Sequence, residues 1–366
     1  MINVLVMGLT DIIGGVEVYI YNLVRYSNRD EIHFDFLCQG RGHAAFQQQI
    51  EEFYEGKVNF YFVPTYKKDF FRCVKELKKI YNKEYDIVYV NTCISTDVLY
   101  AMPYVKKRKT KLVVHSHMAS LDIKQTQHKL FRVLVSGAPD LRLACSEPAA
   151  EFFWKKDYSA VIVKNGIDTD RFTYSDSYRK EIREKYGVND DQLLLGHVGR
   201  FTHLKNQSFI IDILKQLRQK GIDAKLMLVG DGEDKLKIEN KIHQENLTDY
   251  VMLCGVQLET EKYYSAFDAF VMPSISEGFG IVALEAQSVG MFCFLSDRVD
   301  ESVFVTDRAY RIALEDNNQS EWAESIINNR TINKCRTEYA YIISQSGYDV
   351  KRTANQIQIL FNHLLF

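Results

Sequence analysis

Short apolar runs alternate with amphipathic helical stretches along the whole chain, and this alternation limits the possible folds more than any other feature. The first run, Ile2–Met7, is followed by residues 16–26, whose apolar side chains fall on one helical stripe. Parallel strands need a crossover, usually a helix, and they lie buried between two helical layers. The alternation therefore predicts a parallel sheet covered on both faces. The further strands expected in the first half are residues 34–37, 58–63, 87–90, 111–115, 141–144 and 161–163.

The pattern restarts after a polar stretch, residues 165–191, that contains no strand-like run. We place the domain boundary there and expect an α/β fold of two Rossmann-like, doubly wound domains that face each other across a cleft. The expected parts are residues 1–170, residues 171–345 and a C-terminal helix within residues 346–366. The elements expected in the second half are strands at 193–198, 224–229, 251–253, 267–272 and 292–295, and helices at 208–219, 235–244 and 281–289.

Length and composition agree with two globular domains. The 366 residues suffice for two domains of about 100–200 residues each. The 22 Phe and 22 Tyr against only 5 Pro exclude a disordered chain, and a net charge of −2 argues against a general nucleic-acid binder. The seven cysteines form no Cys-x-x-Cys pair and several lie in apolar runs, which predicts buried thiols and not a disulfide framework or a zinc site.

The sequence gives no sign of export or of a membrane span. The apolar start lacks a basic segment and is followed by Asp11, so we expect no signal peptide. No apolar stretch approaches the ~20 residues that span a bilayer. We therefore expect a cytoplasmic protein, either free or attached peripherally to the inner face of the plasma membrane.

The two halves of the chain carry opposite net charge. Residues 1–164 contain 23 Lys and Arg against 18 Asp and Glu, a net charge of +5, and residues 165–366 carry −7. A helix expected after residue 69 interleaves apolar and basic side chains, and such a helix can lie on an anionic membrane. The alternative is a solvated helix face and a charged loop. The apolar residues are Phe70, Phe71, Val74, Leu77 and Tyr81, the basic ones are Arg72, Lys75, Lys78, Lys79 and Lys83, and a second basic run is Lys106, Lys107, Arg108, Lys109 and Lys111.

Gly14 and Gly15 lie between the first expected strand and its helix. Two glycines let the backbone approach a ligand closely, and the amides that open the helix suit a phosphate. The alternative is that they serve only the turn. The dinucleotide pattern Gly-x-Gly-x-x-Gly and the Walker loop are both absent, which disfavours a dehydrogenase or a P-loop enzyme.

Arg200 and Lys205 follow the first expected strand of the second domain. A guanidinium and an ammonium five residues apart, at the carboxyl end of a strand, can both face one diphosphate. The alternative is two surface cations on a loop. Their place at the edge of the expected cleft favours a functional role.

Residues 273–286 combine two carboxylates with a glycine-rich turn that opens a helix. The backbone amides of Gly278, Phe279 and Gly280 can hold an anion, with the helix dipole behind them. Glu277 and Glu285 offer paired acceptors, which suit the neighbouring hydroxyls of a sugar better than acid–base catalysis beside an anion. The alternative is an ordinary acidic first turn, with Ile281, Leu284 and Val289 as the core face of the helix.

His115 and His117 end an expected strand of the first domain. A histidine there can hydrogen-bond a substrate hydroxyl or carry a proton. Metal binding is not expected, because no third histidine or carboxylate stands at ligand spacing. His197 lies inside an expected strand and is interpreted as a core histidine.

Taken together, these segments resemble the retaining glycosyltransferases of family 4, which have the GT-B fold, over almost the whole chain. The segments 114–117 and 296–297 are most similar to bacterial capsule and exopolysaccharide enzymes. One departure is Asp297-Arg298-Val299-Asp300-Glu301, where the family often has a Gly-Gly loop. The motifs that carry the resemblance are Gly14-Gly15-x-Glu17, Gly199-Arg200-x4-Lys205-Asn206, Gly230-Asp231-Gly232, Glu277-Gly278-Phe279-Gly280 with Glu285, and Asn165-Gly166-Ile167-Asp168 with Phe172.

The resemblance implies roles for individual residues. Arg200 and Lys205 would hold the donor diphosphate and stabilise the charge that develops as it leaves. Glu277 would hold the transferred sugar, and His117 would touch that sugar near its 6-hydroxyl. Glu285 would accept hydrogen bonds from the ribose. The residues implied in donor binding are Gly14, Gly15, Gly230, Gly255, Val256, Gly278, Phe279, Gly280, Ile281 and Glu285.

The resemblance also implies the reaction. The enzyme would move a hexose or N-acetylhexosamine from a nucleotide-sugar, first of all a UDP-sugar, to a lipid-linked glycan, with retention and with no metal or other cofactor. The first domain would face the acceptor, and the last helix would cross back onto it. A nucleotide-sugar epimerase or hydrolase of the same fold remains an alternative. A non-catalytic nucleotide-sugar-binding subunit is another, although the complete set of donor residues argues against it.

Overall fold

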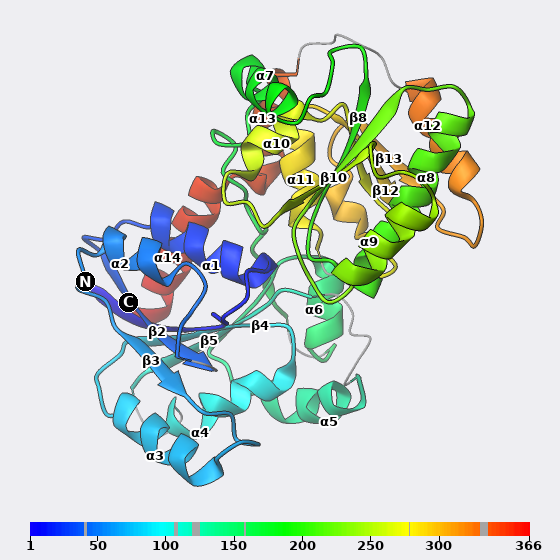
Figure 1. Cartoon of the computed structure of the whole chain (residues 1–366). Coiled ribbons are helices and arrows are strands. Elements are labelled where there is room, and N and C mark those ends of the chain that lie inside the picture. The colour runs from blue at the N-terminus through cyan, green and yellow to red at the C-terminus, as the bar shows by residue number, and fades with distance from the viewer. Residues whose placement is uncertain (40–41, 106–108, 119–124, 157–158, 278, 330–335) are drawn as a thin grey trace. The chain divides into compact units, whose positions relative to one another are not determined.

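The chain folds into two units of the expected doubly wound class (Figure 1). The computed structural model describes residues 1–39, 42–105, 109–118, 125–156, 159–277, 279–329 and 336–366. The first unit comprises Met1–Gly166 and Gly347–Phe366, and the second comprises Ile167–Ser346. The prediction of two Rossmann-like domains is confirmed.

The first unit is built on a parallel sheet in the order β3-β2-β1-β4-β5-β6-β7. β1 lies between β2 and β4, so the strand order reverses there and leaves a crevice at the carboxyl ends of β1 and β4. The strands are β1 (Ile2–Met7), β2 (Ile32–Gln39), β3 (Phe60–Val63), β4 (Ile87–Thr92), β5 (Lys111–Ser116), β6 (Leu141–Ala144) and β7 (Val161–Ile162).

Helices cover both faces of this sheet because successive strand residues point to opposite sides. Val4 and Val6 pack against α1, α2 and α14, whereas Leu5 and Met7 pack against the layer formed by α3, α4, α5 and α6 (Figure 1). The helices of this unit are α1 (Gly15–Tyr26), α2 (Gln47–Phe53), α3 (Phe70–Ile80), η1 (Ser95–Tyr100), α4 (Met102–Val105), α5 (Gln125–Val135), α6 (Glu147–Phe153) and α14 (Val350–Leu365).

The last helix completes the core of the first unit. Ala354, Ile357 and Phe361 of α14 are buried with side chains of α1 and the sheet. The Thr353 hydroxyl donates to the Lys164 carbonyl at 3.0 Å. Gly166 allows this approach, because a Cβ there would lie 2.7 Å from the backbone of residue 350.

The second unit repeats the design with the strand order β10-β9-β8-β11-β12-β13, again all parallel. Here the order reverses between β8 and β11. The strands are β8 (Leu193–Val198), β9 (Ala224–Val229), β10 (Val251–Gly255), β11 (Ala269–Met272), β12 (Phe292–Ser296) and β13 (Ala309–Ile312). The helical segments are α7 (Asp176–Lys185), η2 (His203–Lys205), α8 (Gln207–Gln219), α9 (Lys235–Gln244), α10 (Thr260–Ala266), α11 (Ile281–Ser288), η3 (Glu301–Val303), α12 (Gln319–Asn329) and α13 (Glu338–Ile343), and η4 (Ser344–Tyr348) spans the end of this unit and the return to the first.

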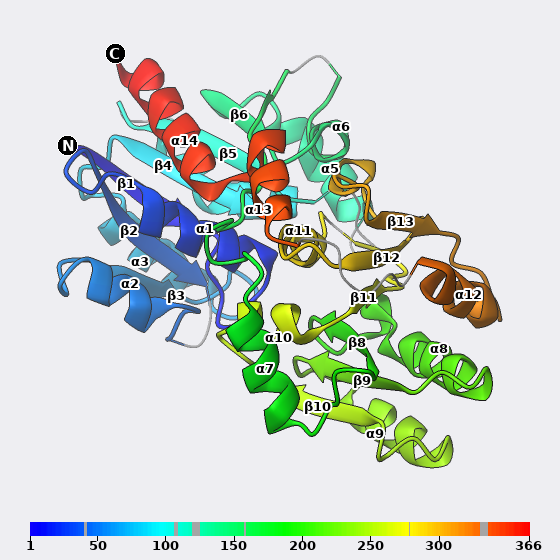
Figure 2. The ribbon, with the colours of Figure 1, turned by 90° about the horizontal axis from the view of Figure 1, so that it is seen from above.

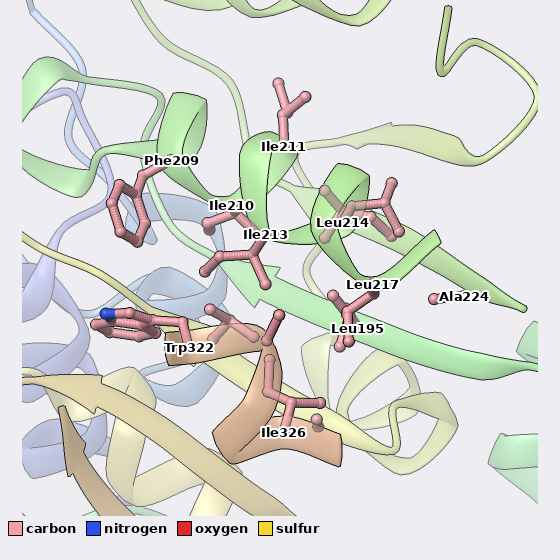
Figure 3. Packing of buried hydrophobic residues seen from close by; sticks show 14 of the residues in the cluster. Leu195, Phe209, Ile210, Ile211, Ile213, Leu214, Leu217, Ala224, Trp322 and Ile326 are labelled. Carbon is pink, nitrogen blue, oxygen red and sulfur yellow. The ribbon is translucent and has the colours of Figure 1, made fainter. Parts of the chain in front are cut away.

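Figure 2 shows α8, α9 and α12 on one side of this sheet and α10 and α11 on the other. The core under α8 contains Leu195, Ile210, Leu214 and other apolar side chains (Figure 3). Trp322 of α12 closes this core and meets the Phe209 ring edge-on at 5.7 Å. These packed layers hold the strand ends, and the loops after them, in fixed positions.

The expected strands are present, with ends that differ by at most two residues. The strand expected at 267–272 begins at Ala269, because Phe267 instead ends α10 and packs over Gly196, where a Cβ would lie 2.0 Å from its ring. The edge strand β13 was not expected, and neither was α7 within the polar stretch. His197 is fully buried, with Nδ1 2.9 Å from the Val271 carbonyl oxygen, so its interpretation as a core histidine is confirmed.

Candidate functional site

The loops that follow β8 and β11 carry three of the four residues expected to be catalytic, Arg200, Lys205 and Glu277. These two strands are neighbours and parallel, so residues 199–206 and 273–280 leave the same edge of the sheet at the point where the strand order reverses. The loops are tied together, since the Ile275 amide donates to the Leu204 carbonyl at 2.8 Å. Open parallel sheets bind their ligands at this kind of crevice.

Lys205 and Glu277 form an ion pair in this crevice. The Lys205 Nζ donates to Glu277 Oε2, and both side chains are largely buried. The same carboxylate oxygen accepts from the Ser274 hydroxyl at 3.3 Å. The cation is therefore held in place before any ligand arrives, with its charge balanced by a carboxylate that a ligand can share.

Arg200 lies in the same loop but has a different partner. Its side chain is 50% exposed and pairs with Glu233 at 3.1 Å. An exposed pair of this kind contributes little to stability, so the guanidinium can exchange partners at small cost. The structure brings Lys205 and Glu277 into contact and leaves Arg200 at the rim of the same loop.

The glycine-rich turn before α11 opens the helix as expected. Gly280 caps the helix with a left-handed backbone, φ +79°, and is buried. The Phe279 side chain is buried, so it anchors the turn from inside, while Ile281 is half-buried. Gly278 lies outside the described residues. The described amides at this end carry the partial positive charge of a helix N-terminus.

Glu285 lies one turn into α11 and is buried. The Tyr264 hydroxyl donates to its Oε2 at 2.9 Å. Burial raises the pKa of Glu285 to about 7, while the hydrogen bond from Tyr264 and the charge of Arg171 act to lower it. The carboxyl group therefore changes its protonation state near neutral pH.

Arg171 and Tyr264 support this carboxyl group and were not expected from the sequence. The Arg171 guanidinium donates to Glu261 Oε2 from Nε at 2.8 Å and from Nη2 at 2.6 Å. The same side chain also donates to the Leu258 carbonyl. Arg171 falls inside the 165–172 signature, which was the available signal, whereas nothing in the sequence marks Tyr264.

Two further strands are followed by or end in a glycine. Gly230 allows a close contact between backbones, and Gly255 leaves open space beside the backbone. Gly230, after β9, has φ +138°, and a Cβ there would lie 2.1 Å from the Gly199 carbonyl oxygen. Its amide donates to the Gly255 carbonyl at 2.8 Å. Gly255 ends β10 with nothing within 4 Å of where a Cβ would lie, and Val256 is exposed, so a ligand can approach both residues.

In the first unit, Gly14 and Gly15 open α1. Gly14 caps the helix in an extended conformation, with no hydrogen bond from a side chain, and its carbonyl accepts from the Val18 amide at 3.0 Å. Gly15 has open space where a Cβ would stand. Both glycines are exposed, so the first amides of α1 lie at the surface of this unit.

His117 is buried in a network of aromatic and amide side chains. Its Nδ1 lies 3.1 Å from Asn165 Oδ1 and its Nε2 lies 3.0 Å from Asn91 Oδ1. Burial lowers the pKa of His117 to about 3, so the ring is neutral at pH 7. The His115 ring lies 4.1 Å away, and its Nδ1 meets the Tyr89 hydroxyl at 2.7 Å. His117 is therefore a neutral hydrogen-bonding group.

Two family descriptions match most of the chain. Residues 13–171 match Glycosyltransferase Family 4, and residues 178–341 match Glycosyl transferases group 1. The two matches correspond closely to the two units, and the second contains the Lys205, Glu277 and Glu285 site. Within the described residues, no group of three His, Cys, Asp or Glu side chains is placed to hold a metal ion.

Individual relatives are similar to this chain over nearly its full length. EpsF of Bacillus subtilis (strain 168), which is named as a glycosyltransferase, is 27% identical over 95% of this chain and 93% of its own. The UDP-Gal:alpha-D-GlcNAc-diphosphoundecaprenol alpha-1,3-galactosyltransferase of Escherichia coli is 21% identical over 91% of this chain and 89% of its own.

Solved structures show the same fold. Alr3699/HepE of Anabaena, crystallised with UDP and glucose, superposes with a TM-score of 0.80 at 20% identity, covering 99% of this chain and 100% of that one. The fold, the two family matches and the full-length relatives all lead to one class. The chain is a glycosyltransferase of the GT-B type, in which a family 4 domain is followed by a group 1 domain.

Proposed function

We propose that the chain is a retaining glycosyltransferase that moves a sugar from a UDP-sugar to a lipid-linked glycan in capsule or exopolysaccharide synthesis. The observation that carries the proposal is the Lys205–Glu277 pair beside the N-terminus of α11. Two relatives support the proposed substrates. EpsF matches over nearly the full length, and the name of the Escherichia coli relative gives UDP-Gal as donor and a diphosphoundecaprenol-linked acceptor. The Anabaena structure holds UDP and glucose.

The chemistry follows from the charges of the site. Cleavage of the anomeric bond leaves a sugar with oxocarbenium character and a departing diphosphate. Lys205, Arg200 and the amides of α11 favour that separated charge over the intact donor, which is what catalysis requires. Glu277 accepts hydrogen bonds from the hydroxyls of the sugar and Glu285 from those of the ribose. The neutral His117 ring is proposed to meet a sugar hydroxyl by exchanging one of its two asparagine partners.

We further propose that the acceptor attacks from the face that the diphosphate leaves, so that no protein nucleophile is needed and the configuration is retained. The positive charge that balances the diphosphate comes from Arg200, Lys205 and the helix N-terminus. The reaction is therefore proposed to need no divalent metal.

The donor is tested by a melting experiment. We expect a UDP-sugar to raise the melting temperature of the full chain more than the matching GDP-sugar, because a ligand that binds the folded state stabilises it by mass action. The shift should be the same with a chelator and with added Mg²⁺. A shift that disappears with the chelator would contradict metal independence. Consumption of the donor without any acceptor would favour the hydrolase alternative.

Contact with an anionic membrane through the first unit is proposed as well. Phe70 and Phe71 at the start of α3 are 56% and 85% exposed. Leu77 and Tyr81, which the sequence placed on the same apolar stripe, instead lie in the core, so the membrane-facing part of α3 is smaller than expected. Part of the second basic run, residues 106–108, lies outside the described residues.

Helix α5 adds a second exposed patch on the same layer of helices. Leu130, Val133 and Leu134 are more than half exposed, and Lys129 beside them is exposed. α3 and α5 cover the same face of the sheet (Figure 1). Apolar side chains among basic ones fit a bilayer with anionic lipids. In the described part of the chain, no helix combines the length and hydropathy needed to cross a bilayer.

We expect Phe70→Ser/Phe71→Ser to weaken binding to vesicles of phosphatidylcholine and phosphatidylglycerol by about tenfold, since two rings no longer bury their area in the lipid. Sedimentation with these vesicles measures the effect. Leu236→Ser is the matched control, because Leu236 is an equally exposed apolar residue of the second unit. Equal sedimentation of the wild type with anionic and neutral vesicles would contradict the proposed contact.

A further inference from the structure

The first unit contains a pocket of about 440 Å³ at the carboxyl ends of β1 and β4. This is the point where the strand order reverses, and its volume falls within the range of small-molecule sites. Its walls come from the loop after β1, the start of α1, the end of β2 and the loop after β4. Gly15, for which the family resemblance implies a donor contact, is part of one wall.

Two carboxylates line this pocket, and each is held by a threonine. Glu17 Oε1 accepts from the Thr10 hydroxyl at 2.7 Å, and Asp97 Oδ2 accepts from the Thr92 hydroxyl at 2.6 Å. Glu17, Cys93 and Asp97 all line the pocket, so the two carboxylates lie around one space. Burial, together with the charges of Asp97 and Glu17, raises the pKa of the Cys93 thiol to about 12.

Asn91 adds an unpaired amide atom to the same wall. The residue is 2% exposed and lines the pocket. One polar atom of its side-chain amide meets His117 Nε2 at 3.0 Å, and the other is buried with no hydrogen-bond partner among the described residues. Buried amide groups in native proteins are nearly always paired, so an unpaired atom beside a cavity indicates a missing partner.

The rest of the lining fits the face of a sugar ring. Met7, Leu9 and Leu37 supply apolar surface. None of the described residues around the pocket is Lys, Arg or His, so two acidic groups face the space with no described cation in its lining. A carboxylate or phosphate on a ligand would meet like charge there, and this repulsion disfavours its binding.

We propose that this pocket holds the terminal sugar of the acceptor, and that Glu17 and Asp97 restrict that sugar to an uncharged one. The two carboxylates accept hydrogen bonds from its hydroxyls, and the unpaired atom of the Asn91 amide hydrogen-bonds a further hydroxyl. Terminal uronic acids and phosphorylated sugars are excluded by repulsion. The inference rests on the proposed function and adds to it the class of acceptor.

The test uses phenyl glycosides as probes with the full chain. Phenyl glucoside, galactoside and N-acetylglucosaminide are compared with phenyl glucuronide and galacturonide, and dissociation constants are measured by NMR titration. We expect the tightest neutral probe to bind at least about tenfold more tightly than its uronate. In Glu17→Gln/Asp97→Asn the ratio should fall to about twofold, with weaker binding of the neutral probe.

Glu52→Gln is the matched control, since it removes one negative charge from the exposed surface of α2 in the same unit, and its ratio should equal that of the wild type. If the double variant does not fold, Glu17→Gln and Asp97→Asn singly should each remove part of the discrimination. Equal binding of neutral and acidic probes, or no binding of either, would overturn the inference. Stabilisation by a UDP-sugar in the same samples reports on the proposed function separately.

Discussion

Lys205→Ala is expected to reduce kcat of sugar transfer by about 10²–10³, while the protein keeps its fold. The Lys205 ammonium is held in advance against Glu277, so its charge is already placed where a departing diphosphate needs it. Removing one preorganised group that stabilises a transition state typically lowers kcat by a factor of this size. The measurement is steady-state transfer with the donor at saturation, alongside a thermal melt.

Two further variants distinguish a catalytic effect from a loss of charge balance. Lys215→Ala removes a lysine of α8, in the same unit, that pairs with Glu245, and it should leave kcat unchanged. Lys205→Ala/Glu277→Ala removes the stranded carboxylate together with its partner and should stay inactive. If the double variant regains activity, or if Lys205→Ala keeps kcat within about threefold, Lys205 does not stabilise the leaving group.

Glu285→Gln is expected to weaken donor binding by about 10- to 100-fold, because hydrogen bonds to a charged acceptor contribute about 1.5–3 kcal/mol. In the wild type the affinity should also depend on pH. Burial raises the pKa of Glu285 to about 7, so below pH 7 the carboxyl group carries a proton and accepts poorly. The dissociation constant of a UDP-sugar should therefore rise as pH falls through 7, by at most about tenfold per pH unit for one proton.

This dependence has its own controls. Glu285→Gln should show no slope near pH 7, and Glu324→Gln, an exposed acid on α12, should keep the wild-type slope. Tyr264→Phe removes a hydrogen bond that lowers the pKa of Glu285, so the midpoint should move upward. Calorimetric titration from pH 5.5 to pH 8.5 measures all four proteins. A pH-independent dissociation constant in the wild type would contradict the proposed role of Glu285.

The fold could be predicted from sequence because buried parallel strands are apolar on both faces. Runs such as Leu193–Val198 are buried along their whole length, so they stand out between amphipathic helices. β13 was missed since it is a four-residue edge strand with an exposed Arg311. α7 was missed because polar side chains attach it to the rest of its unit. Arg179 and Arg183 both form ion pairs with Asp268.

The site was predictable where backbone geometry requires particular residues and where charged or polar residues follow the end of a strand. Gly230 and Gly280 adopt conformations or approaches that other residues do not tolerate, so they appear as motifs. Tyr264 and Asn91 act through side chains that meet their partners only after folding, and an isolated Tyr or Asn carries no such signal. The role of Phe279 as an anchor likewise depends on burial, which spacing does not show.

The return of α14 to the first unit has a consequence for synthesis on the ribosome. When residue 346 has been added, every residue of the second unit exists, and that unit has all it needs to pack its core. The first unit at that moment still lacks Ala354, Ile357 and Phe361, and part of its apolar sheet is uncovered. The unit whose translation begins earlier is thus completed last.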